Sequence, residues 1–145
     1  MKVLFLDIDG CLNLYPNPSR SGKFDKEACI NLEMLLNKVP SLRIVVSSSW
    51  RTYGLDAMRD VLKSNGIDPR RVIDITGHEK SEDERDHRGL QIENWLKRHP
   101  DVKQFAIVDD NDDFVPLGHK LVQTQKTVGL TQGNVEKLLE ILGKN

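Results

Sequence analysis

The stretch of residues 2–13, which reads KVLFLDIDGCLN, decides the fold and raises the first question about function. Four apolar residues at positions 3–6 run directly into Asp7 and Asp9. A continuous apolar run of this length is typical of a strand that is buried on both faces of a sheet. Because a buried charge is costly unless something compensates it, two carboxylates at the end of such a strand indicate a bound partner.

Four more apolar runs follow, and helical patterns lie between most of them. The runs are LRIVV (42–46), RVIDI (71–75), FAIV (105–108) and KLVQT (120–124). Apolar residues at helical spacing predict helices over residues 25–39, 55–65 and 88–99, and a last helix from about Thr131. Strands that alternate with helices are typical of an open parallel sheet. We therefore expect an α/β fold, a three-layer, Rossmann-like parallel sheet of about five strands with helices on both faces.

Length and composition predict one ordinary globular domain over residues 1–145. Of the 145 residues, 30% are charged and 38% are hydrophobic, and the formal net charge is -1. So small a net charge gives no long-range attraction to nucleic acid or to an anionic membrane, although a local basic patch would still provide one. Because the chain shows neither a signal peptide nor an apolar run long enough to cross a bilayer, we expect a cytoplasmic protein that does not enter a membrane.

Acidic and polar residues follow three of the predicted strands, at the point where each strand ends. They are Asp7 and Asp9 after the first strand, Ser47, Ser48, Trp50 and Arg51 after the second, and Asp109, Asp110 and Asp113 after the fourth. Since the carboxyl ends of parallel strands share one edge of a sheet, we expect these side chains to meet in one crevice. Clustered carboxylates repel one another unless a cation lies among them, and oxygen ligands without His or Cys favour Mg²⁺. A bound Mg²⁺ in turn suggests a phosphorylated substrate.

These motifs resemble, in their order and spacing, those of the haloacid dehalogenase-like (HAD) phosphatase superfamily. The first motif, DxDGxL, is DIDGCL at 7–12; the second, a strand that ends in Ser or Thr, is RIVVSS at 43–48; the fourth, a strand that ends in paired acids, is AIVDD at 106–110. The third motif is a Lys or Arg that opens the helix before the fourth-motif strand. Arg88 is the best-placed residue for it, and Arg85 and Lys80 are alternatives.

The resemblance implies a phosphatase with a covalent intermediate. Asp7 would be the nucleophile that forms an aspartyl-phosphate, and Asp9 would be the general acid and then the general base. Mg²⁺ would be held by Asp7, Asp109 and the backbone carbonyl of Asp9. Asp110 and Asp113 would support the metal or its waters.

The resemblance also assigns phosphate-binding roles. Ser47 would donate a hydrogen bond to the transferred phosphoryl group, and Arg88 would offer it positive charge. We also expect Ser48 and Arg51 to bind substrate, but helix capping by Ser48 and a surface ion pair by Arg51 remain open. Trp50 has two open interpretations as well, stacking on a base and packing in the fold.

The substrate is expected to be large. Superfamily members often carry a cap domain over the site, but residues 12–25 are too few for one and residues 52–104 are used by core elements, so we expect no large cap. An open site suits nucleic-acid ends or a phosphoprotein.

The string FLDIDGCLN…VVSSSWR…VDD…LVQT…GLT also resembles capless phosphatase domains associated with RNA-repair proteins and, more distantly, polynucleotide-end phosphatases. That resemblance implies that Arg20, Lys23 and Arg51 guide a phosphate backbone. Two alternatives stay open: a non-catalytic module that binds Mg²⁺ and phosphate and docks to a partner, and a phosphotransferase of the same fold.

Overall fold

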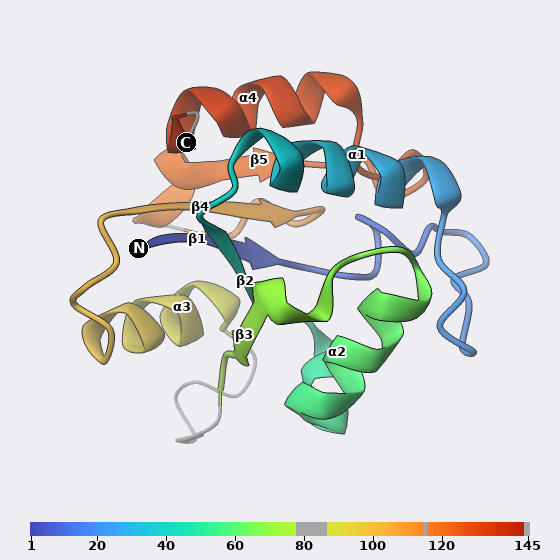
Figure 1. Ribbon diagram of the computed structural model, residues 1–145, viewed down its shortest axis with the longest axis horizontal. Coiled ribbons are helices and arrows are strands. Elements are labelled where there is room, and N and C mark those ends of the chain that lie inside the picture. Colours follow the sequence, from blue (N-terminus) through green and yellow to red (C-terminus); the bar gives the residue numbers. More distant parts are fainter. Residues whose placement is uncertain (78–86, 115, 144–145) are drawn as a thin grey trace.

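A parallel five-stranded sheet runs through the centre of the computed structural model, in the order β3-β2-β1-β4-β5 (Figure 1). The structure describes residues 1–77, 87–114 and 116–143. The strands are β1 (Lys2–Leu6), β2 (Leu42–Val46), β3 (Val72–Ile75), β4 (Gln104–Asp109) and β5 (Leu121–Gln123). Each one coincides with a predicted apolar run. The strand that carries the first motif, β1, lies at the centre of the sheet between β2 and β4.

In the described part of the chain, four α-helices cover the sheet from both faces. They are α1 (Lys26–Lys38), α2 (Leu55–Ser64), α3 (Arg88–Lys97) and α4 (Gln132–Leu142). Helices α1 and α4 lie together on one face, and α3 lies on the other (Figure 1). Shorter 3-10 helices occupy Ser49–Tyr53, Pro69–Arg71 and Leu117–Lys120. The three-layer α/β architecture that the sequence predicts is therefore confirmed.

The central strand is apolar on both sides because both sides are covered. Leu4 and Leu6 are fully buried in the core beneath α1 and α4. Phe5 points to the opposite face, where its ring meets the ring of Trp95 on α3 edge to face, with 5.4 Å between the centroids. The indole N–H of Trp95 donates to Asp74 Oδ2 at 2.8 Å, so this buried tryptophan has its polar atom satisfied.

Local chemistry fixes where the helices begin and end. The side chain of Asp25 accepts a hydrogen bond from the backbone N–H of Ala28 and caps α1. Thr131 and Asn134 form a reciprocal capping box at the start of α4. Gly66 follows α2 with a φ of +89°, a conformation that glycine adopts without strain and that stops the helix.

The connections near the motif-bearing ends of the strands are short. Between β1 and α1 the chain forms an irregular loop, and between β2 and α2 it forms the 3-10 helix Ser49–Tyr53. The described residues therefore contain no large cap domain, as the sequence predicts. None of the helices in the described ranges has the length and apolar character that a membrane span requires.

Candidate active site

The ends of the strands bring the motif residues together, because the sheet hydrogen bonding continues one residue past the strands. The backbone N–H of Asp7 donates to Val108 O at 3.0 Å, and that of Ser47 donates to Leu6 O at 2.8 Å. Asp109 is the last residue of β4. The sheet itself therefore fixes Asp7, Ser47 and Asp109 side by side along one edge.

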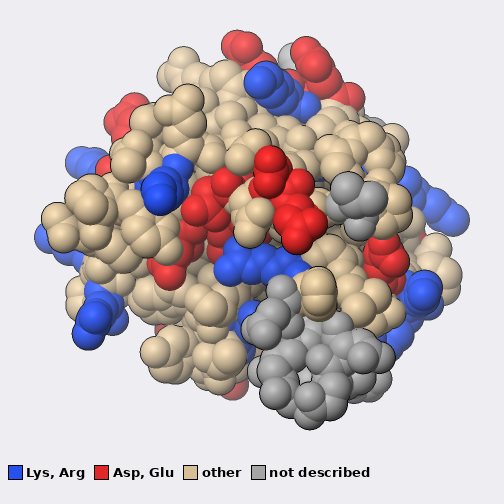
Figure 2. Space-filling view, turned by 180° about the vertical axis from the view of Figure 1, so that it is seen from behind, with Lys and Arg blue, Asp and Glu red and all other residues tan. Residues whose placement is uncertain are grey.

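A cluster of three carboxylates occupies this edge. Asp7, Asp109 and Asp110 each offer a carboxylate oxygen, and these oxygens lie within 4.8 Å of one another. Asp7 and Asp109 are each only 1% exposed. Figure 2 shows acidic side chains gathered near the centre of one face of the molecule, with basic side-chain atoms beside them. Such a cluster is unfavourable unless positive charge lies among the carboxylates.

Arg88, the first residue of α3, supplies part of that charge. Its Nη1 lies 3.0 Å from Asp7 Oδ2 and 2.8 Å from Asp109 Oδ2. The structure thus brings the predicted third-motif cation to the nucleophile candidate. The alternatives Lys80 and Arg85 lie outside the described residues.

The guanidinium does not balance the carboxylates. Burial, followed by the charge of Asp109, raises the pKa of Asp7 to about 9 in spite of the attraction of Arg88. Burial also raises the pKa of Asp109, although Arg88 acts in the opposite direction. Without a further cation, the cluster therefore favours holding a proton.

The donor set fits Mg²⁺. Asp7 Oδ2 is buried and has no hydrogen-bond partner among the described residues, although it contacts Arg88. Its neighbours Asp109 and Asp110 add hard carboxylate oxygens, which Mg²⁺ prefers. Among the described residues, these three are the ones that can hold the ion through their side chains. Asp113, predicted as a support, is exposed and outside this cluster.

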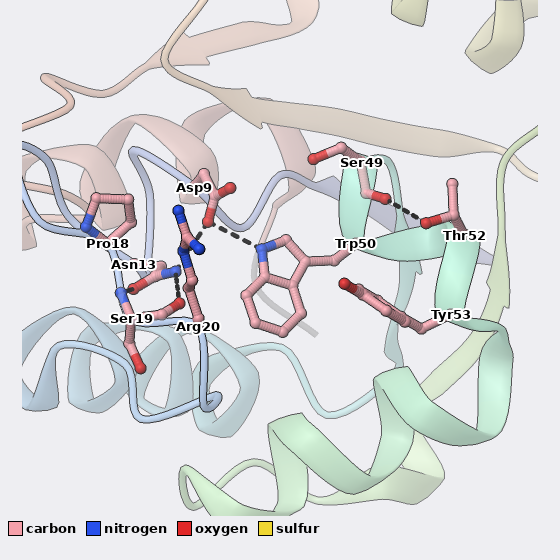
Figure 3. A pocket seen from close by; sticks show the side chains of 9 residues that line it. All are labelled: Asp9, Asn13, Pro18, Ser19, Arg20, Ser49, Trp50, Thr52 and Tyr53. Carbon is pink, nitrogen blue, oxygen red and sulfur yellow. Dashed lines mark hydrogen bonds between the residues drawn. The ribbon is translucent and has the colours of Figure 1, made fainter.

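The carboxylate of Asp9 is held apart from the acidic cluster by two hydrogen bonds to the same oxygen. Trp50 Nε1 and Asn13 Nδ2 each donate to Asp9 Oδ1 at 2.9 Å (Figure 3). Asp9 Oδ2 receives no hydrogen bond from the described residues. One oxygen is therefore anchored, and the other is available to carry a proton.

The sequence alone predicts neither of these two hydrogen bonds to Asp9. Asn13 belongs to no motif, yet its side chain also exchanges hydrogen bonds with the backbone of Ser19 and ties the following loop to Asp9. For Trp50, the sequence is compatible with stacking on a base and with packing in the fold. Trp50 packs edge to face on Phe24, and its contact with Asp9 is a third role.

The predicted phosphate-binding residues of the second motif differ in their surroundings. Ser47 is 2% exposed, and its Oγ has no hydrogen-bond partner among the described residues, so it is free to donate. Ser48 Oγ accepts from the backbone N–H of Trp50, which is the helix-capping alternative. Arg51 is largely buried, and its Nη1 donates to Ser48 O at 2.9 Å. Substrate binding by Ser48 and Arg51 stays a prediction.

A comparison with protein families now adds to this geometry. The family model described as the HAD domain in Swiss Army Knife RNA repair proteins matches residues 3–135. The chain belongs to this family. The superfamily resemblance and the resemblance to RNA-repair domains are thereby confirmed. No curated protein and no solved structure matches the chain.

The first motif of this HAD domain is held by close packing around its glycine. Gly10 has a φ of +86°, and a Cβ at this position would lie 2.4 Å from Asp110 Oδ2. Thr124, the residue after β5, donates its hydroxyl to Gly10 O at 2.8 Å. The thiol of Cys11 lies 3.2 Å from the same hydroxyl oxygen and donates to it, because the hydroxyl proton is already used. The end of β5 therefore supports the motif loop.

A groove of about 510 Å³ opens beside Asp9 (Figure 3). We call it the Asp9 groove; it is lined by Asp9, Asn13, Pro18, Ser19, Arg20, Ser49, Trp50, Thr52 and Tyr53. Of the residues predicted to guide a phosphate backbone, Arg20 lines the groove, whereas Arg51 and Lys23 do not. The HAD domain thus has a charged centre at the sheet edge and, next to it, a groove with aromatic and hydroxyl side chains.

Proposed function

We propose that this HAD domain is a Mg²⁺-dependent phosphomonoester hydrolase that works through an aspartyl-phosphate on Asp7 and acts on nucleic-acid ends. The observation that carries the proposal is the convergence of two kinds of binding group at one sheet edge. Asp7, Asp109 and Asp110 suit a cation. The unpartnered hydroxyl of Ser47 and the guanidinium of Arg88 suit the oxygens of a phosphoryl group.

In the proposed reaction, a carboxylate oxygen of Asp7 attacks phosphorus while the bond between phosphorus and the leaving oxygen breaks. Asp9 gives its proton to the leaving oxygen. Asp9 then takes a proton from a water molecule, whose oxygen attacks the phosphorus of the aspartyl-phosphate and releases inorganic phosphate and free Asp7. Bound Mg²⁺ supplies positive charge that keeps Asp7 ionised and offsets the charge of the phosphoryl oxygens.

The surroundings of Asp9 support its proposed role. Two donors on Oδ1 fix the direction of the carboxylate and leave Oδ2 for the proton. A module that only binds Mg²⁺ and phosphate has no use for a second carboxylate that is oriented in this way and kept out of the metal cluster. We therefore favour an enzyme over a binding module.

Nucleic-acid ends are the proposed substrates for two reasons. The described residues include no large cap that would restrict the site to small metabolites, and the family is described from RNA repair proteins. An exposed arginine, Arg20, borders the entrance beside Asp9 and suits a phosphodiester backbone.

The test is a phosphatase screen with and without Mg²⁺. It contains 3′- and 5′-phosphorylated oligonucleotides, nucleotides, sugar phosphates and phosphopeptides. We expect Mg²⁺-dependent phosphate release from an oligonucleotide end, its loss in Asp7→Asn, and no change in Asp101→Asn, an exposed carboxylate just before β4 at the opposite edge of the sheet.

Each other outcome has a distinct meaning. Turnover in Asp7→Asn that equals the wild type would refute the covalent mechanism. Mg²⁺ binding without turnover on any substrate would favour the binding module. Transfer of the phosphate to an acceptor other than water would identify a phosphotransferase.

A further inference from the structure

The Asp9 groove contains two aromatic rings that meet at an angle. The rings of Trp50 and Tyr53 have centroids 5.9 Å apart and planes inclined by 59° (Figure 3). Tyr53 is 72% exposed, the largest exposed fraction among the exposed large hydrophobic side chains of the described residues. A ring presented to solvent in this way offers a flat surface on which another ring can stack.

Polar groups surround this aromatic corner. The groove is also lined by the hydroxyl side chains of Ser19, Ser49 and Thr52, and by Arg20. Arg20 is exposed and has no ion pair within the described ranges. A flat apolar surface with hydrogen-bonding groups at its rim and one positive charge matches a heterocyclic base, its sugar and a phosphodiester.

The position of the groove shows which part of a substrate it would receive. Trp50, whose ring lines the groove, donates its Nε1–H to Asp9 at 2.9 Å. In the proposed reaction, Asp9 gives its proton to the leaving oxygen, so the leaving group has to lie next to Asp9. The groove is therefore on the leaving-group side of the site.

We propose that the Asp9 groove binds the terminal nucleoside of a phosphorylated nucleic-acid end. Its base stacks on Tyr53 against Trp50, and the next phosphodiester lies at Arg20. This inference rests on the proposed function, because it identifies the leaving group of that reaction. A groove for a phosphopeptide would instead be expected to use an arginine cluster or a free strand edge, and neither lines this groove in the described part of the chain.

The experiment measures binding rather than turnover. The protein is the Asp7→Asn variant, which is not expected to hydrolyse the probes, and the probes are single-stranded oligonucleotides phosphorylated at the 3′ or the 5′ end. Each probe is compared with one that lacks only the terminal base. We expect the base to tighten binding about tenfold or more at one of the two ends, which is the range that stacking of one base on an aromatic side chain provides.

Substitutions of two groove residues, Tyr53 and Arg20, in that background identify the groups responsible. Tyr53→Ala is expected to abolish the preference for the base-bearing probe, whereas Tyr53→Phe, which keeps the ring, retains it. Arg20→Ala is expected to weaken binding and to reduce its salt dependence by about one phosphate contact. Arg98→Ala is the matched control, because Arg98 is exposed at the end of α3 and lines no part of the groove.

Equal affinity for the base-bearing and base-free probes at both ends would overturn the inference. Tighter binding of a phosphopeptide, with a loss in Tyr53→Ala, would overturn it in favour of a protein substrate. This binding result can be distinguished from a failure of the proposed hydrolase activity. Base-dependent binding without phosphate release by the wild type would support the groove assignment and refute the hydrolase, whereas release without base preference would do the reverse.

Discussion

Two hydrogen bonds to one oxygen decide how the carboxylate of Asp9 faces the site. Trp50 and Asn13 both donate to Oδ1, and they come from different segments: Trp50 follows β2 and Asn13 follows β1. A carboxylate held in this way cannot turn to exchange its two oxygens. In the proposed reaction, Trp50 would therefore be a positioning residue that acts through Asp9.

Replacement of the indole N–H is the direct test of this role. In Trp50→Phe an aromatic ring remains to pack on Phe24, but one donor to Asp9 is lost. We expect kcat to fall roughly tenfold for oligonucleotide ends, whose alkoxide leaving groups need the proton of Asp9, since a hydrogen bond to a charged group has an energy of this order. With an aryl phosphate, whose leaving group needs less protonation, the fall in kcat is expected to be clearly smaller.

Trp95→Phe serves as the matched control because it also removes an indole N–H, here the donor to Asp74 in the core. It is expected to lower the free energy of unfolding and to leave the ratio of the two activities unchanged. If Trp50→Phe reduced both activities equally, the positioning role would be refuted.

The sequence predicts the charged residues of the site better than their supports. Asp7, Asp109 and Arg88 lie where a strand ends or a helix begins, so periodicity and motif order place them. Asn13 hydrogen-bonds to Asp9 and Ser19 because the irregular loop after β1 turns back on itself. Hydrophobic periodicity does not predict the path of such a loop. The side chains of Ser48 and Arg51 are buried in the bend after β2, and substrate binding by these two residues stays a prediction.

At the scale of elements, the outermost strand supports the loop that follows the central one. Thr124 comes directly after β5 and is 3% exposed. Its hydroxyl donates a hydrogen bond to Gly10 O and accepts one from the thiol of Cys11. Gly10 in turn leaves room for Asp110. The position of a metal-ligand candidate thus depends on a hydroxyl at the far side of the sheet.

Thr124→Val is expected to destabilise the protein and to weaken Mg²⁺ binding. The substitution keeps the volume but leaves two buried polar groups without a partner, at a cost of about 1–3 kcal/mol in the free energy of unfolding. Denaturant unfolding and titration with Mg²⁺ measure the two effects. Thr124→Ser, which keeps the hydroxyl, is expected to retain Mg²⁺ affinity; an equal loss in both variants would show that the methyl group, not the hydroxyl, matters.

The strands and helices themselves follow closely from the sequence. Apolar runs predict all five strands because the sheet is covered on both faces, and the caps Asp25 and Thr131 fix helix starts. The 3-10 helix Ser49–Tyr53 was not predicted, since its apolar residues have no helical repeat. This helix nevertheless contributes Trp50 and Tyr53, the two aromatic residues that line the Asp9 groove.

At the scale of the whole molecule, negative charge is concentrated at the site, although the chain as a whole is almost neutral. The formal net charge is only -1, but three carboxylates share one buried edge with one guanidinium. The repulsion there opposes folding in the absence of a cation. Function and stability are therefore linked through the same residues.

This link predicts a pH-dependent stabilisation by Mg²⁺. The pKa of Asp7 is raised from 3.8 to about 9 in the metal-free fold, mainly by burial. The folded protein therefore keeps a proton that the unfolded chain releases, and the resulting stability is fully present below about pH 4 and is lost as the pH rises toward about 9. With a chelator, we expect Tm to fall between about pH 5 and about pH 8. Mg²⁺ replaces the proton, so the rise in Tm that it causes is expected to grow over the same range.

Asp7→Asn is the decisive variant for this prediction, because it removes both the titrating carboxylate and a metal-ligand candidate. Its metal-free Tm is expected to exceed that of the wild type near pH 8 and to change less with pH, and its response to Mg²⁺ is expected to be small. Asp101→Asn, with an exposed carboxylate outside the cluster, is expected to behave like the wild type. A wild-type Tm that rose with pH in chelator, or a Mg²⁺ response that Asp7→Asn retained in full, would contradict the assignment of Asp7 to a buried cation site.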